Sequence, residues 1–165
     1  AAFPFRGKFR SGNVAVRLGP DGSMFVGGTD RGWGARGGKR FALERCHFTG
    51  TIPFEVLEMK AKPDGFLITF TQEVDSKSAA DIASYQMSAY TYIYQSGYGS
   101  PVVDKTTPSI TAATVSSDRK SVYLKVNGLV KGNIHELNLP GVKNTKDESL
   151  LHSVGYYTLN EIPAK

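Results

Sequence analysis

The chain has 165 residues and a formal net charge of +5, with 40% hydrophobic and 21% charged residues. This composition is typical of one globular domain, or of one domain joined to part of another, and it excludes wholesale disorder. No apolar run approaches the roughly 20 residues that a membrane-spanning helix needs. The first ten residues, AAFPFRGKFR, lack the apolar stretch of a secretion signal.

The predicted elements begin with a hairpin. Residues 13–28 read as two strands joined by the Gly-Pro-Asp-Gly sequence at 19–22, which is a strong turn signal. Residues 29–44 contain too much glycine for a strand or a stable helix, so they are predicted to form a long loop. Residues 41–50 read as a further strand-like run that ends in a turn.

From residue 55 onward, seven runs have the length and composition of β-strands. Their apolar residues alternate, as Phe66, Ile68 and Phe70 do. Only residues 76–84 have helical character, and Ser78 is the expected N-cap of a short helix there. Seven short strands with polar turns between them predict an all-β, immunoglobulin-like antiparallel β-sandwich. The seven runs cover residues 55–61, 65–71, 85–94, 109–116, 120–127, 134–139 and 154–160.

Charge and glycine content divide the chain in two. Residues 1–45 hold nine Lys or Arg against three Asp or Glu, whereas the remainder holds eleven basic and twelve acidic residues. Ten of the eighteen glycines precede residue 39. We therefore expect a boundary near residues 50–55, between a basic, Gly-rich segment over 1–52 and a sandwich domain over 53–165.

Two stretches carry a resemblance to known families. GPDGSMFVGGTDRGWG, residues 19–34, resembles the closing blade of the β-propeller in the bacterial glucose/sorbosone dehydrogenase-like family. GFLITFTQEVDSKSAADIASYQM, which starts at Gly65, and the run from Ser109 to Asn144 resemble a bacterial immunoglobulin-like domain. The resemblance implies the C-terminal region of an exported, periplasmic or extracellular, multidomain sugar-dehydrogenase-like protein.

The same resemblance implies where the chemistry of such a protein resides. Members of the propeller family use pyrroloquinoline quinone or related redox chemistry in a site that several blades build together. One blade cannot supply that site, and no catalytic residue of the family can be matched here. We therefore expect no cofactor and no catalytic residue in this chain.

A candidate binding cluster lies in the Gly-rich loop. Asp30, Arg31, Trp33 and Arg36 combine an aromatic ring with guanidinium groups, which suits an anionic or sugar-like ligand or a partner's carboxylates. The alternative is a structural loop whose Trp packs on a neighbouring blade. Residues 32–37 also match G-x-G-x-x-G, but no β-α-β unit follows, so a dinucleotide site is not expected.

Other sites are disfavoured by the sequence. The basic residues of the N-terminal segment are scattered among glycines and no recognition helix is evident, which argues against nucleic acid. His47, His135 and His152 have no metal-ligand spacing, and His135 reads as a partly buried strand histidine. The single cysteine, Cys46, forms neither a disulfide within the chain nor a thiolate cluster.

The second candidate site is a row of tyrosines. Tyr90, Tyr92 and Tyr94 are two residues apart, so one strand would place all three on its outer face, while residues 87 and 89 face the core. Tyr98 follows in a Gly-rich loop that we expect to fold over the same edge. We predict that the row packs against the N-terminal segment near Trp33. A sugar-stacking platform is the alternative.

These observations favour a non-catalytic structural or interaction module whose partner is the remainder of its own parent protein. The alternative is a carbohydrate-binding module that uses exposed tyrosines. An enzyme is disfavoured, because no serine, histidine and aspartate set or carboxylate pair can be recognised from spacing.

Overall fold

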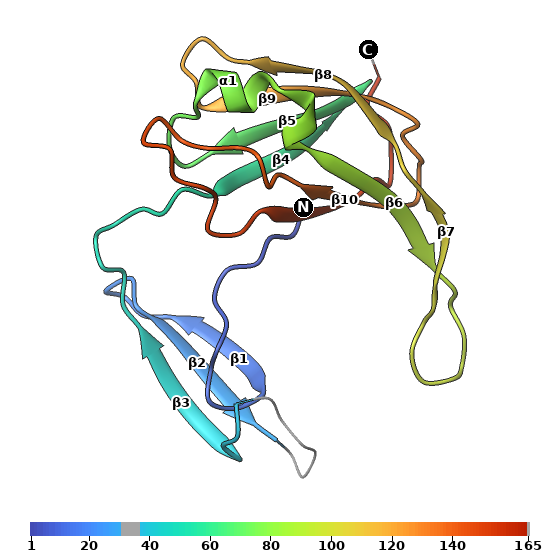
Figure 1. Cartoon of the computed structure of the whole chain (residues 1–165). Coiled ribbons are helices and arrows are strands. Elements are labelled where there is room, and N and C mark those ends of the chain that lie inside the picture. The colour runs from blue at the N-terminus through green and yellow to red at the C-terminus, as the bar shows by residue number, and fades with distance from the viewer. Residues whose placement is uncertain (31–36, 165) are drawn as a thin grey trace. The chain divides into compact units, whose positions relative to one another are not determined.

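The computed structural model describes residues 1–30 and 37–164, which divide into two compact units (Figure 1). One unit consists of Phe5–Ile52. The other consists of Pro53–Lys165 together with Ala1–Pro4.

The smaller unit is built on a three-stranded antiparallel sheet in the order β1-β2-β3. The predicted hairpin is confirmed, and its turn is held by Asp21, whose carboxylate accepts hydrogen bonds from the amide and hydroxyl of Ser23 and also contacts Arg45. These contacts lower the pKa of Asp21 to about 2. A propeller blade has four strands, and the described residues supply three. The strands are β1 (Asn13–Leu18), β2 (Met24–Thr29) and β3 (Phe41–Cys46).

The larger unit is an antiparallel β-sandwich, as predicted. One sheet has the order β11-β10-β6-β7 and the other β4-β5-β9-β8. All seven predicted runs form strands. The strands are β4 (Val56–Lys62), β5 (Gly65–Phe70), β6 (Gln86–Tyr92), β7 (Val102–Thr106), β8 (Ser109–Val115), β9 (Ser121–Asn127), β10 (Ile134–Asn138) and β11 (Val154–Thr158).

The eighth strand, β7, was not predicted. It lies at the edge of its sheet and pairs only with β6, with an irregularity in register between Ala89 and Thr91. None of its residues is buried, so it lacks the apolar alternation that marks the other strands. Asp104 in its centre has a positive φ of 53°, which fits an irregular edge strand.

The core lies between the two sheets and follows the predicted phases. Phe66 and Ile68 are fully buried, and Phe70 is 2% exposed. The ring of Phe66 contacts His135 and Tyr157, which come from the opposite sheet, at centroid distances of 5.6 and 5.4 Å. His135 is completely buried, more than the partial burial expected from sequence, because β10 is an interior strand of its sheet.

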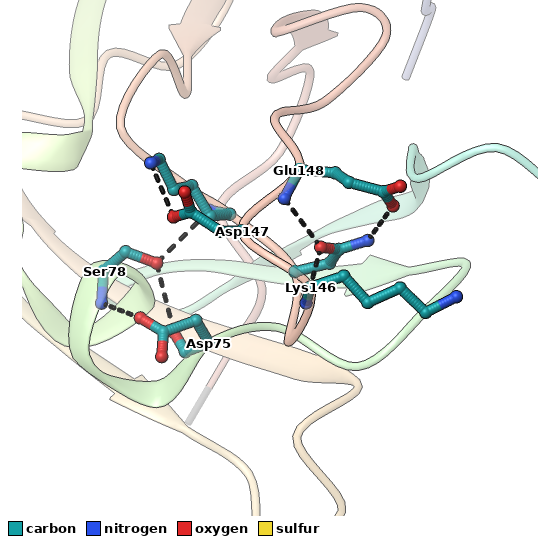
Figure 2. Close-up of polar contacts among 7 residues, drawn as sticks. Asp75, Ser78, Lys146, Asp147 and Glu148 are labelled. Atoms are coloured by element: carbon teal, nitrogen blue, oxygen red, sulfur yellow. Dashed lines mark hydrogen bonds and ion pairs between the residues drawn. The ribbon is translucent and has the colours of Figure 1, made fainter.

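The short helix is present as predicted, but its N-cap is Asp75 and not Ser78. The structure has α1 (Ser76–Ala80) followed by a short 3₁₀ turn, η1 (Ile82–Ser84). Asp75 is the N-cap, and its carboxylate accepts a hydrogen bond of 2.7 Å from the Ser78 amide. That bond is the main reason why the pKa of Asp75 is lowered. The Ser78 hydroxyl instead accepts a bond of 3.2 Å from the Lys143 amide, which ties the helix to the turn after β10 (Figure 2).

Asn144 organises that turn. Its side-chain oxygen accepts bonds of 2.9 Å from the amides of both Lys146 and Glu148. Its side-chain nitrogen donates to the Glu148 carboxylate, at 2.6 Å (Figure 2). The same nitrogen donates to the side-chain oxygen of Gln72, at 2.9 Å. Asn144 is 1% exposed, so these four bonds replace its contacts with water.

The N-terminal residues depart from the expected boundary. Ala2 forms an antiparallel bridge with Tyr156 of β11, with hydrogen bonds of 2.8 and 2.9 Å in the two directions. Phe3 packs against the sandwich core, and a β-carbon on Gly155 would lie 2.6 Å from its ring. The first four residues therefore belong with the sandwich, and the Gly-rich segment begins at Phe5.

Residues 53–165 should nevertheless fold without residues 1–52, because every other member of the sandwich core comes from this range. Loss of Phe3 should lower the free energy of unfolding by about 1–2 kcal/mol relative to the whole chain. The measurement is thermal unfolding followed by circular dichroism. Phe3→Ala in residues 1–165 is the matched control and should show a similar loss, whereas an insoluble or non-cooperative product would show that the larger unit needs residues 5–52.

Candidate functional site

The outer face of the β11-β10-β6-β7 sheet carries Tyr90 and Tyr92. As predicted, they share a face, while Met87 and Ala89 are buried on the opposite one. The two rings meet edge to face with centroids 5.7 Å apart. Tyr90 is 9% exposed, whereas Tyr92 is 46% exposed. Tyr92 therefore presents ring surface that a ligand can reach.

The Tyr90 hydroxyl fixes a carboxylate on the neighbouring strand. It donates a hydrogen bond of 3.2 Å to Glu136 of β10, and the side chain of Asn138 donates a second bond of 3.2 Å to the same carboxylate. Burial raises the pKa of Tyr90, and the adjoining Glu136 and Tyr92 raise it further. The Tyr90 hydroxyl therefore stays protonated and acts as a donor near neutral pH.

Tyr94 and Tyr98 do not continue the row. The strand ends at Tyr92, and both residues belong to the loop between β6 and β7, which is visible in Figure 1. Their side chains are fully exposed. The loop is held by its own contacts, such as a 2.9 Å bond from the Gln95 side chain to the Gly99 carbonyl. Tyr98 does not fold over the sheet edge as expected.

Residues of β10 and β11 lie beside Tyr90 and Tyr92, and together they line an open groove. Ile134 pairs with both Tyr90 and Thr158, which places the three side chains in one row across the sheet. Tyr156 lies on the same face, opposite Glu136. No local pattern in the sequence marks Tyr156 or Glu136, because their position beside Tyr90 depends on strand order and register. The groove has a volume of about 740 Å³ and is lined by Ala1, Ala2, Tyr90, Tyr92, Ile134, Tyr156, Tyr157, Thr158 and Asn160.

The predicted cluster in the Gly-rich loop falls partly outside the described residues. Asp30 follows β2, its amide donates a 2.9 Å bond to the Arg40 carbonyl, and its carboxylate lies 3.4 Å from Arg40 Nε. Arg31, Trp33 and Arg36 lie outside the described residues. The aromatic–guanidinium cluster and the packing of tyrosines near Trp33 therefore stay predictions.

The three-stranded sheet of the smaller unit, which we call the open sheet, is a second candidate surface. Within Phe5–Ile52, Val26 is the one buried hydrophobic residue among those described. By register, Leu18 lies on the face of Met24, whereas Leu43 lies on the opposite face with Gly27. Both faces thus present apolar groups that this unit does not cover itself. The large apolar residues exposed in the unit are Phe5, Val14, Val16, Leu18, Phe41, Leu43, Phe48 and Ile52.

No metal site emerges from the part of the chain that the structure describes, where no group of three His, Cys, Asp or Glu residues could hold an ion. His47 contacts the Ser23 hydroxyl at 3.2 Å, and His152 pairs with Glu55 at 2.6 Å. His135 lies in the sandwich core. The three histidines therefore serve separate local contacts.

The stability of the sandwich should fall as the pH drops below 6.5 because of His135. Burial lowers the pKa of His135 below its ordinary value of 6.5. The unfolded chain therefore takes up a proton at a higher pH than the folded chain, and stability is lost as pH falls from 6.5 towards the folded pKa. Urea unfolding at several pH values measures this loss. His135→Gln should flatten the dependence, and an equally steep dependence in that variant would contradict the assignment.

No helix among the described residues is long and apolar enough to cross a membrane.

Comparisons with known proteins identify a fold. No protein-family model matches the chain, and no curated protein matches it. A structure described as surface layer protein SbsC, domains 1-6, is similar over 69% of this chain, with 20% identity and a TM-score of 0.51. The N-terminal part of the bacterial S-layer protein SbsC is similar over 66%, with 18% identity and a TM-score of 0.50. The similar regions cover 15% and 24% of those two chains, so this chain spans a small part of their length.

Proposed function

We propose that this chain is a non-catalytic structural and attachment module of an exported multidomain protein. In this proposal the sandwich is a rigid body, and the open sheet packs against a further polypeptide. The observation that carries the proposal is the smaller unit with its open sheet: among its described residues eight large apolar side chains are exposed, five of them in the sheet, and one is buried. A sheet that buries so little apolar surface gains little stability alone, and exposed apolar patches mark interaction surfaces.

The sandwich supports a structural role. Its interior is apolar, and its conspicuous polar groups, Asp75, Ser78 and Asn144, are engaged in hydrogen bonds that hold turns together. The similar solved structures belong to a surface layer protein of which this chain matches a small share. That likeness in fold fits a module within a larger cell-surface protein and supports an exported location.

Dye binding and self-association test the role of the open sheet. The whole chain should bind 1-anilinonaphthalene-8-sulfonate and associate with itself as its concentration rises. Leu18→Lys combined with Leu43→Lys should reduce both effects, because it places a charge on each face. Leu57→Lys is the matched control, since Leu57 is 63% exposed on the sandwich, and it should change neither. A monomeric chain that binds no dye would contradict an uncovered sheet.

The sugar-dehydrogenase parent remains a more specific proposal, which rests on the resemblance of residues 19–34 to a propeller blade and on the immunoglobulin-like stretches that follow it. Neither of the solved structures named above is a dehydrogenase. The proposal for this chain does not depend on that parent. In a dye-linked assay with added quinone and calcium, the chain should turn over no aldose. Turnover above the buffer blank would overturn the non-catalytic assignment.

A further inference from the structure

We propose that the tyrosine groove of the sandwich binds an uncharged glycan, with Tyr92 and Tyr156 as stacking surfaces and Glu136 as an acceptor for sugar hydroxyls. The groove is the one lined by Tyr90, Tyr92, Tyr156 and the neighbouring residues of β10 and β11. This inference does not depend on the open sheet, since every lining residue belongs to the larger unit.

Two tyrosine rings in the groove are accessible to a ligand. Tyr92 is 46% exposed at the end of β6, and Tyr156 is half-buried on β11. Tyr90 lies on β6 beside Ile134 of β10, the strand between β6 and β11, and it makes an edge-to-face contact with Tyr92. The apolar face of a pyranose ring packs on such rings, while a tyrosine hydroxyl remains free to bond at the wet edge.

Two hydrogen bonds already orient the Glu136 carboxylate beside the groove. Tyr90 donates to one oxygen of Glu136, and Asn138 donates to the other. Each carboxylate oxygen accepts more than one hydrogen bond, so capacity remains for hydroxyl donors of a ligand. Thr158 and Asn160 add further polar groups at the rim of the groove. A polyhydroxylated ligand therefore meets donors and acceptors beside an apolar surface.

The charged groups at the groove disfavour anionic ligands. The groove lining contains no Lys or Arg, and Glu136 is the carboxylate beside it. Phosphates, sulfated glycans and nucleic acids need cationic partners, so they do not suit this surface. An uncharged saccharide brings no charge of its own into the groove, and its hydroxyl groups can donate to the Glu136 carboxylate.

The test is a titration of the whole chain, residues 1–165, with three hexasaccharides. Chitohexaose is uncharged, hexagalacturonate is anionic, and fully deacetylated chitosan hexamer is cationic. Chitohexaose should bind weakly, with a Kd on the order of 1 mM as expected for an open groove, and should shift the NMR signals of β6, β10 and β11. Hexagalacturonate should bind at least about tenfold more weakly, because the Glu136 carboxylate repels it and no cationic side chain lines the groove.

Variants locate the site. Tyr92→Ala should weaken binding of chitohexaose by about tenfold, whereas Tyr92→Phe keeps the ring and most of the affinity. Tyr123→Ala is the matched control on the other sheet and Tyr98→Ala the control in the loop, and neither should change the affinity. Glu136→Gln should weaken binding by less than about threefold, since the amide oxygen still accepts a hydrogen bond.

Three outcomes would overturn the proposal. The first is no binding of chitohexaose up to about 10 mM. The second is a preference for the cationic hexamer that Glu136→Gln abolishes, which would make the groove a cation site. The third is binding that Tyr98→Ala removes and Tyr92→Ala does not, which would place the ligand on the loop between β6 and β7.

Discussion

Replacing Phe66 by alanine should lower the free energy of unfolding of the sandwich by about 3–5 kcal/mol. Phe66 is completely buried on β5, and its ring contacts His135 and Tyr157. Alanine would therefore remove the ring and leave a cavity between the sheets, because close-packed side chains relax only partly into such a space.

Urea unfolding monitored by circular dichroism measures the loss at Phe66. Phe66→Leu should cost less, since it restores part of the lost volume. Leu57→Ala is the control on β4, where the side chain is 63% exposed, and it should change stability by no more than about 0.5 kcal/mol. A loss below about 1 kcal/mol in Phe66→Ala would mean that the two sheets do not meet at this residue.

Replacing Asn144 by alanine should cost about 2–4 kcal/mol, although the side chain is polar and lies in a turn. The variant loses four hydrogen bonds and leaves the amides of Lys146 and Glu148 without their acceptor. Groups that stay shielded from water without a partner cost more than the bonds themselves contributed.

Asn144→Asp separates the acceptor role from the donor role. Aspartate keeps an oxygen for the two amides, but it places a carboxylate beside Glu148 in place of the donating nitrogen. It should therefore be less stable than the parent near pH 7 and regain part of the loss when the carboxylates are protonated. Asn127→Ala, on the exposed end of β9, is the control and should be nearly neutral. An equally neutral Asn144→Ala would contradict the network.

The strands of the sandwich could be predicted because burial enforces a period of two along the chain. Phe66, Ile68 and Phe70 show that pattern, and all three lie in the core. β7 carries no such pattern, because an exposed edge strand has no buried face. The sequence favours Ser78 as the N-cap, whereas the structure has Asp75, because both are capping residues and only the backbone geometry decides between them.

Only part of the candidate groove can be predicted from the sequence. The spacing of Tyr90 and Tyr92 predicts a shared face, since alternate residues of a strand point the same way. Tyr156 and Glu136 join them through pairing between strands that lie far apart along the chain. Register between such strands is set by the whole core, so no local pattern reports it. For the same reason the sequence does not predict the bridge between Ala2 and Tyr156, which are far apart along the chain.

Hydrogen exchange of the isolated chain tests the central claim most directly, namely that the open sheet is an attachment surface and the sandwich a self-sufficient body. We expect the amides of β2 to exchange at least about 100-fold faster than those of β5 and β9, because the sheet around β2 buries one hydrophobic side chain while β5 and β9 lie in the sandwich core. Protection of β2 equal to that of β5 and β9 would show that the smaller unit is stable without a partner, and it would contradict the account.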